Sequence, residues 1–141
     1  MQLETSIGLE VHAQLLTDTK LFCSCLNKYG RDPNVNVCPI RMGLPGALPV
    51  LNNNAVDFVL KSALALNSNI LQEIQFSRKN YFYPDLPKGY QISQFDAPVA
   101  VDGYLEIKVG QGLKKIGISS LHLEEDAGKL IHGFDQDKNE A

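Results

Sequence analysis

The most regular pattern in the chain is a helical repeat that ends near residue 67. In AVDFVLKSALALN (55–67) apolar side chains recur three and four residues apart, as they do along one face of an α-helix. The three asparagines at 52–54 are favoured N-caps, and Asn67 suits a left-handed stop. We therefore predict one clear helix over 53–67 that packs its apolar face into a core.

Alternation of apolar and polar side chains near the N-terminus predicts a strand over residues 5–16. Ile7, Leu9 and Val11 alternate with polar positions, which places Glu10 and His12 on the same face. A polar face opposite a core face is usually solvated. A carboxylate and an imidazole two residues apart also suit a functional site.

Strand patterns return after residue 70. The dipeptide Asp102-Gly103 lies between two β-rich runs in 98–107 and is typical of a type I′ hairpin turn. Residues 114–123 form a further strand pattern that would pair back onto these runs. The shorter predictions are strands at 72–77, 80–83 and 90–95 and a turn at 84–89.

Residues 22–50 lack a clear period and are rich in proline and glycine. A stretch of this length needs a metal, a partner or burial to hold it. Few helices and several antiparallel strand candidates predict an α+β class with a mainly antiparallel sheet. The polar tail 133–141 follows an apolar stretch without a closing element, so it is either a cut inside a longer protein or a naturally frayed end.

Length and composition narrow the class of protein. With 141 residues, 44% apolar and 21% charged, the chain fits one globular domain. Thirteen basic and sixteen acidic residues give a net charge of −3, which argues against coating nucleic acid by bulk charge but not against a local basic patch. No apolar run approaches the roughly 20 residues of a membrane span, and the N-terminus lacks a secretory signal. Three cysteines, an odd count, favour a reducing cytoplasm.

The densest set of metal-ligating side chains is acidic. Glu10 and His12 lie near the start of the chain, and Glu124, Glu125 and Asp126 follow the last predicted strand. Carboxylate oxygens with one imidazole suit Mg²⁺ or Mn²⁺, and a cation would relieve the repulsion within the acidic triplet. The alternative is a solvated acidic loop.

A second candidate is a thiolate site. Cys23 and Cys25 are separated by one residue, and Cys38 follows with a proline after it. A closed zinc site needs a fourth ligand, and Arg41 stands where a second cysteine pair would be completed. Asp32, a distant histidine or water would have to serve instead. The alternative is three free thiols.

A third candidate is the segment SRKNYFYPDLPKGYQISQ (77–94), which interleaves basic and aromatic side chains. Basic groups bind phosphates and aromatic rings stack on bases, and Lys88 in its turn could present an ammonium group to a phosphate. The alternative is an aromatic hairpin with solvated lysines. The chain contains neither a P-loop nor a G-x-S-x-G nucleophile elbow.

Six blocks of sequence resemble, in the same order, the B subunit of the bacterial and organellar aspartyl/glutamyl-tRNA amidotransferase. They cover nearly all of residues 6–132 and read IGLEVHAQL (7–15), KLFCSC (20–25), NVCP (36–39), MGLPGALPVLN (42–52), RKNYFYPDLPKGYQISQ (78–94) and HLEEDAGKLIH (122–132). Members of that family are several hundred residues long. The resemblance therefore implies that residues 1–141 are the N-terminal portion of the catalytic domain, a fragment without the helical tRNA-binding part.

The resemblance implies a reaction and its participants. The family amidates misacylated Glu-tRNA(Gln) and Asp-tRNA(Asn). ATP phosphorylates the side-chain carboxylate of the attached amino acid, which supplies a leaving group. Ammonia, released from glutamine by the amidase subunit, then displaces phosphate, and a small third subunit clasps the complex. ATP and Mg²⁺ are the implied cofactors, and the implied location is the cytoplasm, or the organellar matrix in a eukaryote.

Site residues follow from the resemblance by position. Glu10, His12 and Glu125 are the implied catalytic residues, and with Glu124 they are the implied magnesium ligands. A strand that continued to residue 125 would turn the two neighbouring carboxylates to opposite faces, so a bulge or turn must intervene for both to ligate. The implied contacts to ATP phosphates or the tRNA 3′ end are Lys79, Tyr81, Tyr83 and Lys88.

One position departs from the family pattern. Many members carry C-x-C…C-P-x-C, which resembles a structural zinc site, and Arg41 here replaces the fourth cysteine. The remaining Cys23, Cys25 and Cys38 therefore favour a remnant over an occupied four-thiolate site. Two other functions stay open on the sequence alone, a non-catalytic RNA-binding module and a fragment that only docks the amidase subunit. The isolated 141 residues are expected to be inactive.

Overall fold

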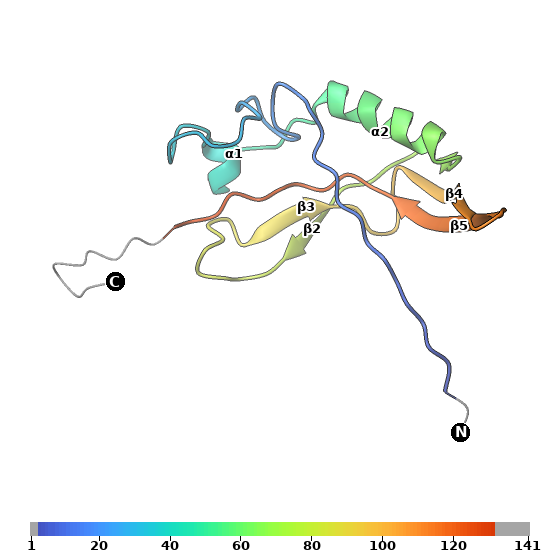
Figure 1. The fold of residues 1–141 in the computed structure, drawn as a ribbon. Coiled ribbons are helices and arrows are strands. Elements are labelled where there is room, and N and C mark those ends of the chain that lie inside the picture. Colours follow the sequence, from blue (N-terminus) through green and yellow to red (C-terminus); the bar gives the residue numbers. More distant parts are fainter. Residues whose placement is uncertain (1–2, 132–141) are drawn as a thin grey trace.

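The computed structural model describes residues 3–131, and its helices lie on one side of its strands (Figure 1). Every strand pair in this range is antiparallel, which confirms the predicted α+β class. No helix in it has the length and apolarity to cross a membrane. The tail 133–141 lies outside the described residues. The elements are α1 (Pro39–Met42), α2 (Asn53–Ala65), β1 (Asn69–Ile70), β2 (Ser77–Asn80), β3 (Tyr90–Ser93), β4 (Ala100–Val109) and β5 (Gly112–Leu121).

Helix α2 begins and ends close to the predicted residues. The side-chain oxygen of Asn52 accepts a hydrogen bond from the N–H of Asn54 at 2.9 Å, which is N-cap geometry. Asn67 takes a φ of 52° just beyond the helix, as a left-handed stop requires. Val59 and Ala63 are buried on the apolar face. The helical period in the sequence therefore predicted the helix and part of its core-facing side, because Leu64 on the predicted apolar face is 67% exposed.

The core joins α2 to the larger sheet. Val59 of α2, Val99 before β4 and Leu123 after β5 form its buried centre. Partly buried side chains pack around them, namely Leu15, Leu21, Leu51, Leu60, Phe76 and Leu121. Because Leu123 directly precedes the acidic residues 124–126, the core also fixes where this segment starts.

The three-stranded sheet has the order β1-β4-β5, and its hairpin turn lies elsewhere than predicted. Strand β4 continues through Asp102 and Gly103, and the chain reverses only after Val109. Asp102 does take a positive φ of 54°, but a Cβ on Gly103 would lie 2.1 Å from the Oγ of Ser68. The predicted turn is therefore wrong, because glycine is needed here for close packing.

The second sheet is the β2–β3 hairpin. The strands predicted at 72–77 and 80–83 are replaced by one strand, β2, whose Ser77 pairs with Ser93 and whose Asn80 pairs with Tyr90. The strand predicted over 90–95 is β3. The strand predicted over 114–123 is β5, which begins two residues earlier and pairs with β4. Strands β3 and β5 were thus predicted close to their positions, whereas β2 was not.

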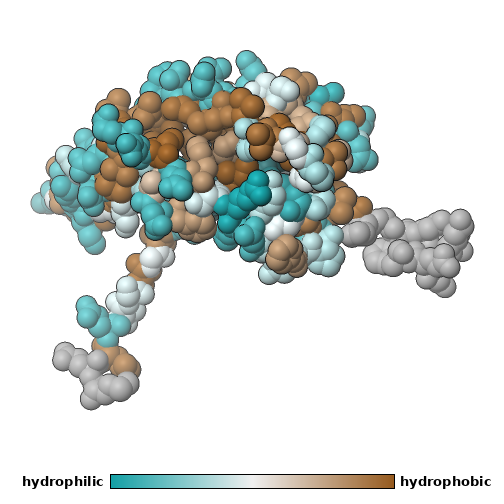
Figure 2. Space-filling model, turned by 180° about the vertical axis from the view of Figure 1, so that it is seen from behind, coloured by the Kyte–Doolittle hydropathy of each residue, from teal (hydrophilic) through white to brown (hydrophobic). Residues whose placement is uncertain are grey.

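The strand predicted over residues 5–16 is not formed. Residues 3–16 have no regular secondary structure, and Ile7, Leu9 and Val11 are 83%, 92% and 91% exposed. The segment leads away from the body of the molecule (Figures 1 and 2). A strand needs a neighbour for its N–H and C=O groups, and no strand among the described residues pairs with this one.

Residues 22–50 are irregular, as predicted, but they are pinned to the start of α2. The N–H of Val50 donates to the carbonyl of Phe22 at 3.0 Å, and the N–H of Asn52 donates to that of Leu21 at 2.9 Å. The single helical turn α1 starts at Pro39 in the middle of this stretch. An element of four residues is too short to leave a periodic signal in the sequence.

Truncation of the core beside the acidic residues should destabilise the protein. Leu123→Ala is expected to lower the free energy of unfolding by about 2–4 kcal/mol, because a buried side chain is lost and a cavity remains. Leu113→Ala is the matched control, since Leu113 is 73% exposed, and its expected cost is below about 0.5 kcal/mol. Urea unfolding followed by circular dichroism measures both, and equal losses would contradict a core centred on Val59, Val99 and Leu123.

Candidate functional site

Three charged side chains from distant parts of the chain, Arg41, Lys88 and Glu125, meet in a buried ion triad. Nη1 of Arg41 lies 2.9 Å from Oε1 of Glu125, and Nζ of Lys88 lies 2.5 Å from Oε2. The side chains of Glu125 and Lys88 are 2% and 1% exposed, and that of Arg41 is 10% exposed. Because water is nearly excluded, salt screens these contacts far less than it screens surface ion pairs.

The backbone around Glu125 is also held. Its N–H donates to the carbonyl of Ile92 at 2.9 Å, and its own carbonyl accepts from Nε2 of Gln91 at 2.7 Å. Its Oε2 accepts from the N–H of Ile92 at 3.2 Å, so a side-chain oxygen stands where a sheet carbonyl would be. Residues 122–126, the acidic segment, therefore run beside β3 in one fixed position.

Separate elements deliver the partners of Glu125. Arg41 lies in α1, which ends at Gly43 with a φ of 68°. A Cβ on Gly43 would lie 2.5 Å from the Cβ of Lys88, so only glycine allows α1 to approach the turn before β3. In Figure 1 the acidic segment passes between α1 and the β2–β3 hairpin. The ion triad therefore joins three segments that share no β-ladder.

The ammonium group of Lys88 has a protein partner in this structure. Besides Glu125, it lies 4.7 Å from the centre of the Tyr90 ring, which Arg78 also contacts at 4.5 Å. Lys88 was expected from the family resemblance to contact ATP or tRNA. The buried ammonium group is not open to a large ligand in this conformation, so that role stays a prediction.

The other expected ligand contacts lie on the open surface of the β2–β3 hairpin. Lys79 is exposed in β2, and Tyr83 is 63% exposed in the loop that follows. The rings of Tyr81 and Tyr83 meet edge to face with centres 5.6 Å apart, and Phe82 between them is 87% exposed. This surface can offer rings for stacking and an ammonium group for a phosphate.

The four expected magnesium ligands form two separate pairs. Nε2 of His12 lies 3.5 Å from Oε1 of Glu10 on the exposed N-terminal segment, as their spacing predicts. Glu124 lies beside Glu125, and its carboxylate accepts a hydrogen bond from Ser93 at 3.1 Å. Within residues 3–131 these carboxylates and the imidazole do not converge on one point. The oxygen-rich donor set suits Mg²⁺, but two pairs apart do not make its octahedral site, so the assignment stays a prediction.

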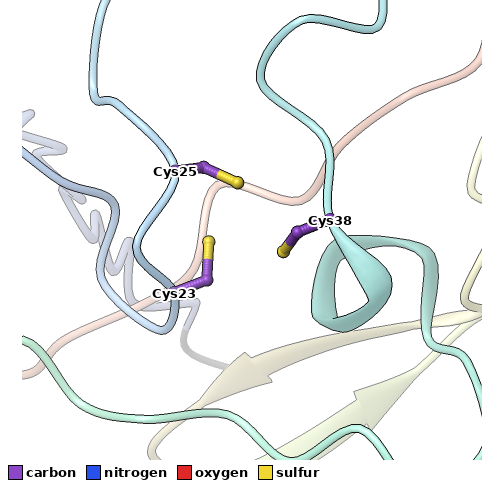
Figure 3. Close-up of side chains that lie close together, drawn as sticks. All are labelled: Cys23, Cys25 and Cys38. Atoms are coloured by element: carbon purple, nitrogen blue, oxygen red, sulfur yellow. The ribbon is translucent and has the colours of Figure 1, made fainter.

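The cysteine cluster, Cys23, Cys25 and Cys38, is brought together by two loops. The three sulfurs lie within 4.8 Å of one another and point toward a common centre (Figure 3). Cys23 and Cys25 belong to a loop closed by the bridge between Thr19 and Leu26, and Cys38 directly precedes α1. All three are free thiols.

Asn52 ties the cysteine loop to α2. Its Nδ2 donates to the carbonyl and the hydroxyl oxygen of Thr19 at 3.1 and 2.9 Å, while its Oδ1 caps the helix. The N–H of Lys20 donates to the carbonyl of Cys25 at 2.9 Å and closes the loop. A cavity of about 420 Å³ opens beside Cys23 and Ile40. The positions of these thiols are therefore set by backbone and amide hydrogen bonds.

The cysteine cluster supplies three of the four ligands that a tetrahedral zinc site needs. Zinc–sulfur bonds of about 2.3 Å in a tetrahedron separate the sulfurs by about 3.8 Å, so these sulfurs would have to close by at most about 1 Å. No fourth cysteine, histidine or carboxylate from residues 3–131 joins them, and Arg41 binds Glu125 instead. The three thiolates could hold a soft cation with one coordination position left open, and the expected remnant of a zinc site stays a prediction.

Two thiols of the cysteine cluster differ in acidity. Burial raises the pKa of Cys38, but hydrogen bonds from the N–H groups of Arg41 and Ile40 and from the other two thiols outweigh it, so this pKa lies below its ordinary value. Burial, followed by hydrogen bonds to Cys38 and Cys23, raises the pKa of Cys25 to about 11. As pH rises, Cys38 therefore becomes the nucleophilic thiolate before Cys25 does.

The partners of Glu125 could not be found from the sequence. There, Arg41 is only a residue that cannot bind zinc. In the structure its guanidinium reaches across 84 positions to Glu125, and Lys88 reaches across 37. No periodic pattern links such distant positions. The close approach at Gly43 is visible only once the fold is known.

The different acidities can be tested by alkylation with iodoacetamide in the presence of a chelator. At pH 8, Cys38 is expected to react about tenfold or more faster than Cys25, because thiolate is the reactive form. Residue-resolved mass spectrometry over pH 6–11 measures both rates, and the rate at Cys25 should still rise near pH 11. Cys38→Ser serves as the control, since it should also lower the pKa of Cys25. Faster labelling of Cys25 would contradict the assigned order.

Comparison with known proteins places this geometry in a family. A family model described as the GatB/GatE catalytic domain matches residues 5–141. Proteins named as the B subunit of aspartyl/glutamyl-tRNA(Asn/Gln) amidotransferase are similar over most of the chain. The one from Carboxydothermus hydrogenoformans is 59% identical over 129 residues, which cover 92% of this chain and 27% of that protein. Those from Geotalea uraniireducens and Caldanaerobacter subterraneus are 55% and 58% identical over 132 residues, 94% of this chain and 28% of each protein.

The match is nearly complete for this chain and partial for its relatives. The chain spans little more than a quarter of the length of these relatives, whereas the family model covers it from residue 5 to residue 141. The blocks noted in the sequence, including those that carry Glu125, Lys88 and the cysteine cluster, fall within that range. The chain belongs to the GatB/GatE catalytic-domain family.

Proposed function

We propose that the protein forms part of the active site of an ATP-dependent tRNA amidotransferase that converts misacylated Glu-tRNA(Gln), Asp-tRNA(Asn) or both to the matching amides. The observation that carries this proposal is 55–59% identity, over 92–94% of the chain, to proteins named as the B subunit of such an enzyme. The reaction class is that of a carbon–nitrogen ligase that takes its nitrogen from glutamine.

The chemistry explains why ATP is needed. A carboxylate oxygen of the misacylated side chain attacks the γ-phosphorus of ATP, a new P–O bond forms, and the bond to ADP breaks. Ammonia then attacks the acyl carbon, the C–N bond forms, and phosphate leaves, while the nitrogen loses a proton. Positioning and charge stabilisation supply most of the catalysis in phosphoryl transfer. Magnesium, when bound, would neutralise part of the phosphate charge, and its expected ligands lie in two separate pairs in this structure.

Two parts of this chain support such a site. The acidic segment is held rigidly beside β3, and Glu124 within it has Ser93 as its hydrogen-bond partner. The β2–β3 hairpin presents Lys79 together with the exposed rings of Phe82 and Tyr83. Such a surface suits a nucleobase and its phosphates, whether they belong to ATP or to the tRNA 3′ end.

The proposed enzyme also contains partner subunits. The relatives are named as one subunit of an enzyme, which supports an assembly with an ammonia-supplying amidase subunit and a small third subunit. Apolar side chains stay exposed on one face of the molecule (Figure 2) and along the N-terminal segment, among them Leu9 and Val11. Apolar surface of this kind is typical of interfaces. The proposed setting is the cytoplasm.

Substitution of two proposed site residues tests the function in the assembled enzyme. His12→Ala and Glu125→Gln are each expected to reduce tRNA-dependent ATP hydrolysis about hundredfold or more, as expected for the loss of groups that position the reactants. Glu106→Gln, on the exposed surface of β4, is the matched control and should stay within about twofold of wild type. Phosphate release with Glu-tRNA(Gln) and Mg²⁺ measures the rates, and excess EDTA should abolish them.

The outcomes separate the candidate functions. Loss of hydrolysis with unchanged tRNA affinity is the result expected of a phosphorylating site. Full hydrolysis in both variants would contradict the proposed site residues. Binding of tRNA without any ATP turnover in the wild-type enzyme would instead favour an RNA-binding module.

A further inference from the structure

Arg41 is the least expected member of the ion triad. It lies three residues after Cys38 in the single helical turn α1, between two irregular stretches. A long cationic side chain at such a place is usually solvated. Here the side chain is 10% exposed and its guanidinium contacts the acidic segment. The burial of this charged side chain therefore needs a specific interaction to explain it.

The guanidinium of Arg41 holds two acceptors at once. Nη1 donates to Oε1 of Glu125 at 2.9 Å, and Nη2 donates to the carbonyl of Asp126 at 2.6 Å. The chain comes so close that a Cβ on Gly128 would lie 3.4 Å from Nη2. A planar group that binds two acceptors fixes direction as well as distance. The carboxylate of Glu125 and the peptide of Asp126 therefore cannot move independently.

Lys88 and the backbone complete the hold on Glu125. A carboxylate has about four acceptor positions. Arg41 takes one on Oε1, while Lys88 and the N–H of Ile92 bind Oε2. About one position is left, on the oxygen next to Arg41. Glu125 can therefore offer a further partner a single contact from a single direction.

The balance of charge agrees with a positioning role. Two cations face Glu125, and Glu124 and Asp126 on either side of it bring the group back to a net negative charge. A buried charge without its partner is strongly unfavourable. Loss of Arg41 would therefore release the acidic segment from α1, while Lys88 could still neutralise Glu125.

We propose that Arg41 is a positioning residue for the site. With Lys88 it fixes the carboxylate of Glu125, and through Asp126 the whole acidic segment, against α1. The proposal rests on the proposed function, since it assigns Arg41 to orient a segment of the phosphorylating site. It also links the cysteine cluster to that site, because Cys38 is the N-cap of the helix that carries Arg41.

Kinetics of the assembled enzyme test this role. Arg41→Met is expected to lower the kcat of tRNA-dependent ATP hydrolysis about tenfold and to leave the KM for ATP within about twofold, because misplacement affects reaction more than binding. Arg41→Lys keeps the charge but loses the two-acceptor geometry, so its kcat should fall about two- to threefold, less than that of Arg41→Met. Arg31→Met is the matched control, since the exposed Arg31 donates only to the Asn36 side chain among the contacts in residues 3–131, and it should leave both constants unchanged.

A second measurement separates positioning from a merely structural role. A positioning residue acts through Glu125, so adding Arg41→Met to Glu125→Gln should lower the remaining kcat by no more than about twofold. A further tenfold loss would overturn the proposal, and so would an Arg41→Met enzyme that equals Arg31→Met. If the Arg41→Met protein does not assemble into the enzyme, the kinetics of the Arg41→Lys variant provide the test. It should then lose two- to threefold in kcat at unchanged KM for ATP, and no loss at all would overturn the proposal.

Failure of this inference can be told apart from failure of the proposed function. A Glu125→Gln enzyme with wild-type hydrolysis would remove the acidic segment from the active site, and the role of Arg41 with it. A strongly impaired Glu125→Gln enzyme beside an unimpaired Arg41→Met enzyme would overturn the role of Arg41 alone.

Discussion

The contacts of Glu125 with Arg41 and Lys88 hold together parts of the molecule that no sheet connects. A buried carboxylate must be paired, and removing one partner of a buried ion pair costs about 3–5 kcal/mol. Typical domains are stable by only about 5–15 kcal/mol in total. Backbone hydrogen bonds also hold the acidic segment to β3, and one carboxylate that is 2% exposed ties both of them to α1. The hydrophobic core ends at Leu123, two residues before this carboxylate, so apolar packing and ion pairing meet at one place.

How far the sequence predicts the fold depends on how local each signal is. Helix α2 followed from its 3.6-residue period, and Asn52 and Asn67 marked its ends because capping is a local interaction. The Asp102-Gly103 signal failed because the glycine serves a contact with Ser68, which lies in the loop between α2 and β1. The N-terminal alternation is a true strand pattern, but a strand also requires a partner, and none of the strands in residues 3–131 provides one.

In the candidate site, too, the sequence predicts local contacts and not long-range ones. Glu10 and His12 meet because they are two residues apart, and the cysteine cluster was visible as a set of ligand types with suitable spacing. The ion triad could not be predicted, because it depends on where α1 lies relative to β3. Arg41 shows this most clearly. On the resemblance it was expected to stand in place of the fourth cysteine of a zinc site, and in the fold it becomes the partner of Glu125. The cysteine cluster and the acidic segment are thereby neighbours through one helical turn.

The most direct test of this arrangement is a double-mutant cycle on the free energy of unfolding, with Lys88→Met and Glu125→Gln singly and together. If the buried ion triad holds the three segments, each single substitution should cost about 3 kcal/mol or more, since it leaves a buried charge with fewer partners. The double variant should then be more stable than the sum of the single losses by at least about 1 kcal/mol. Losses that add within about 0.5 kcal/mol would show that the two side chains do not depend on each other, and would contradict the central place of Glu125 in the fold.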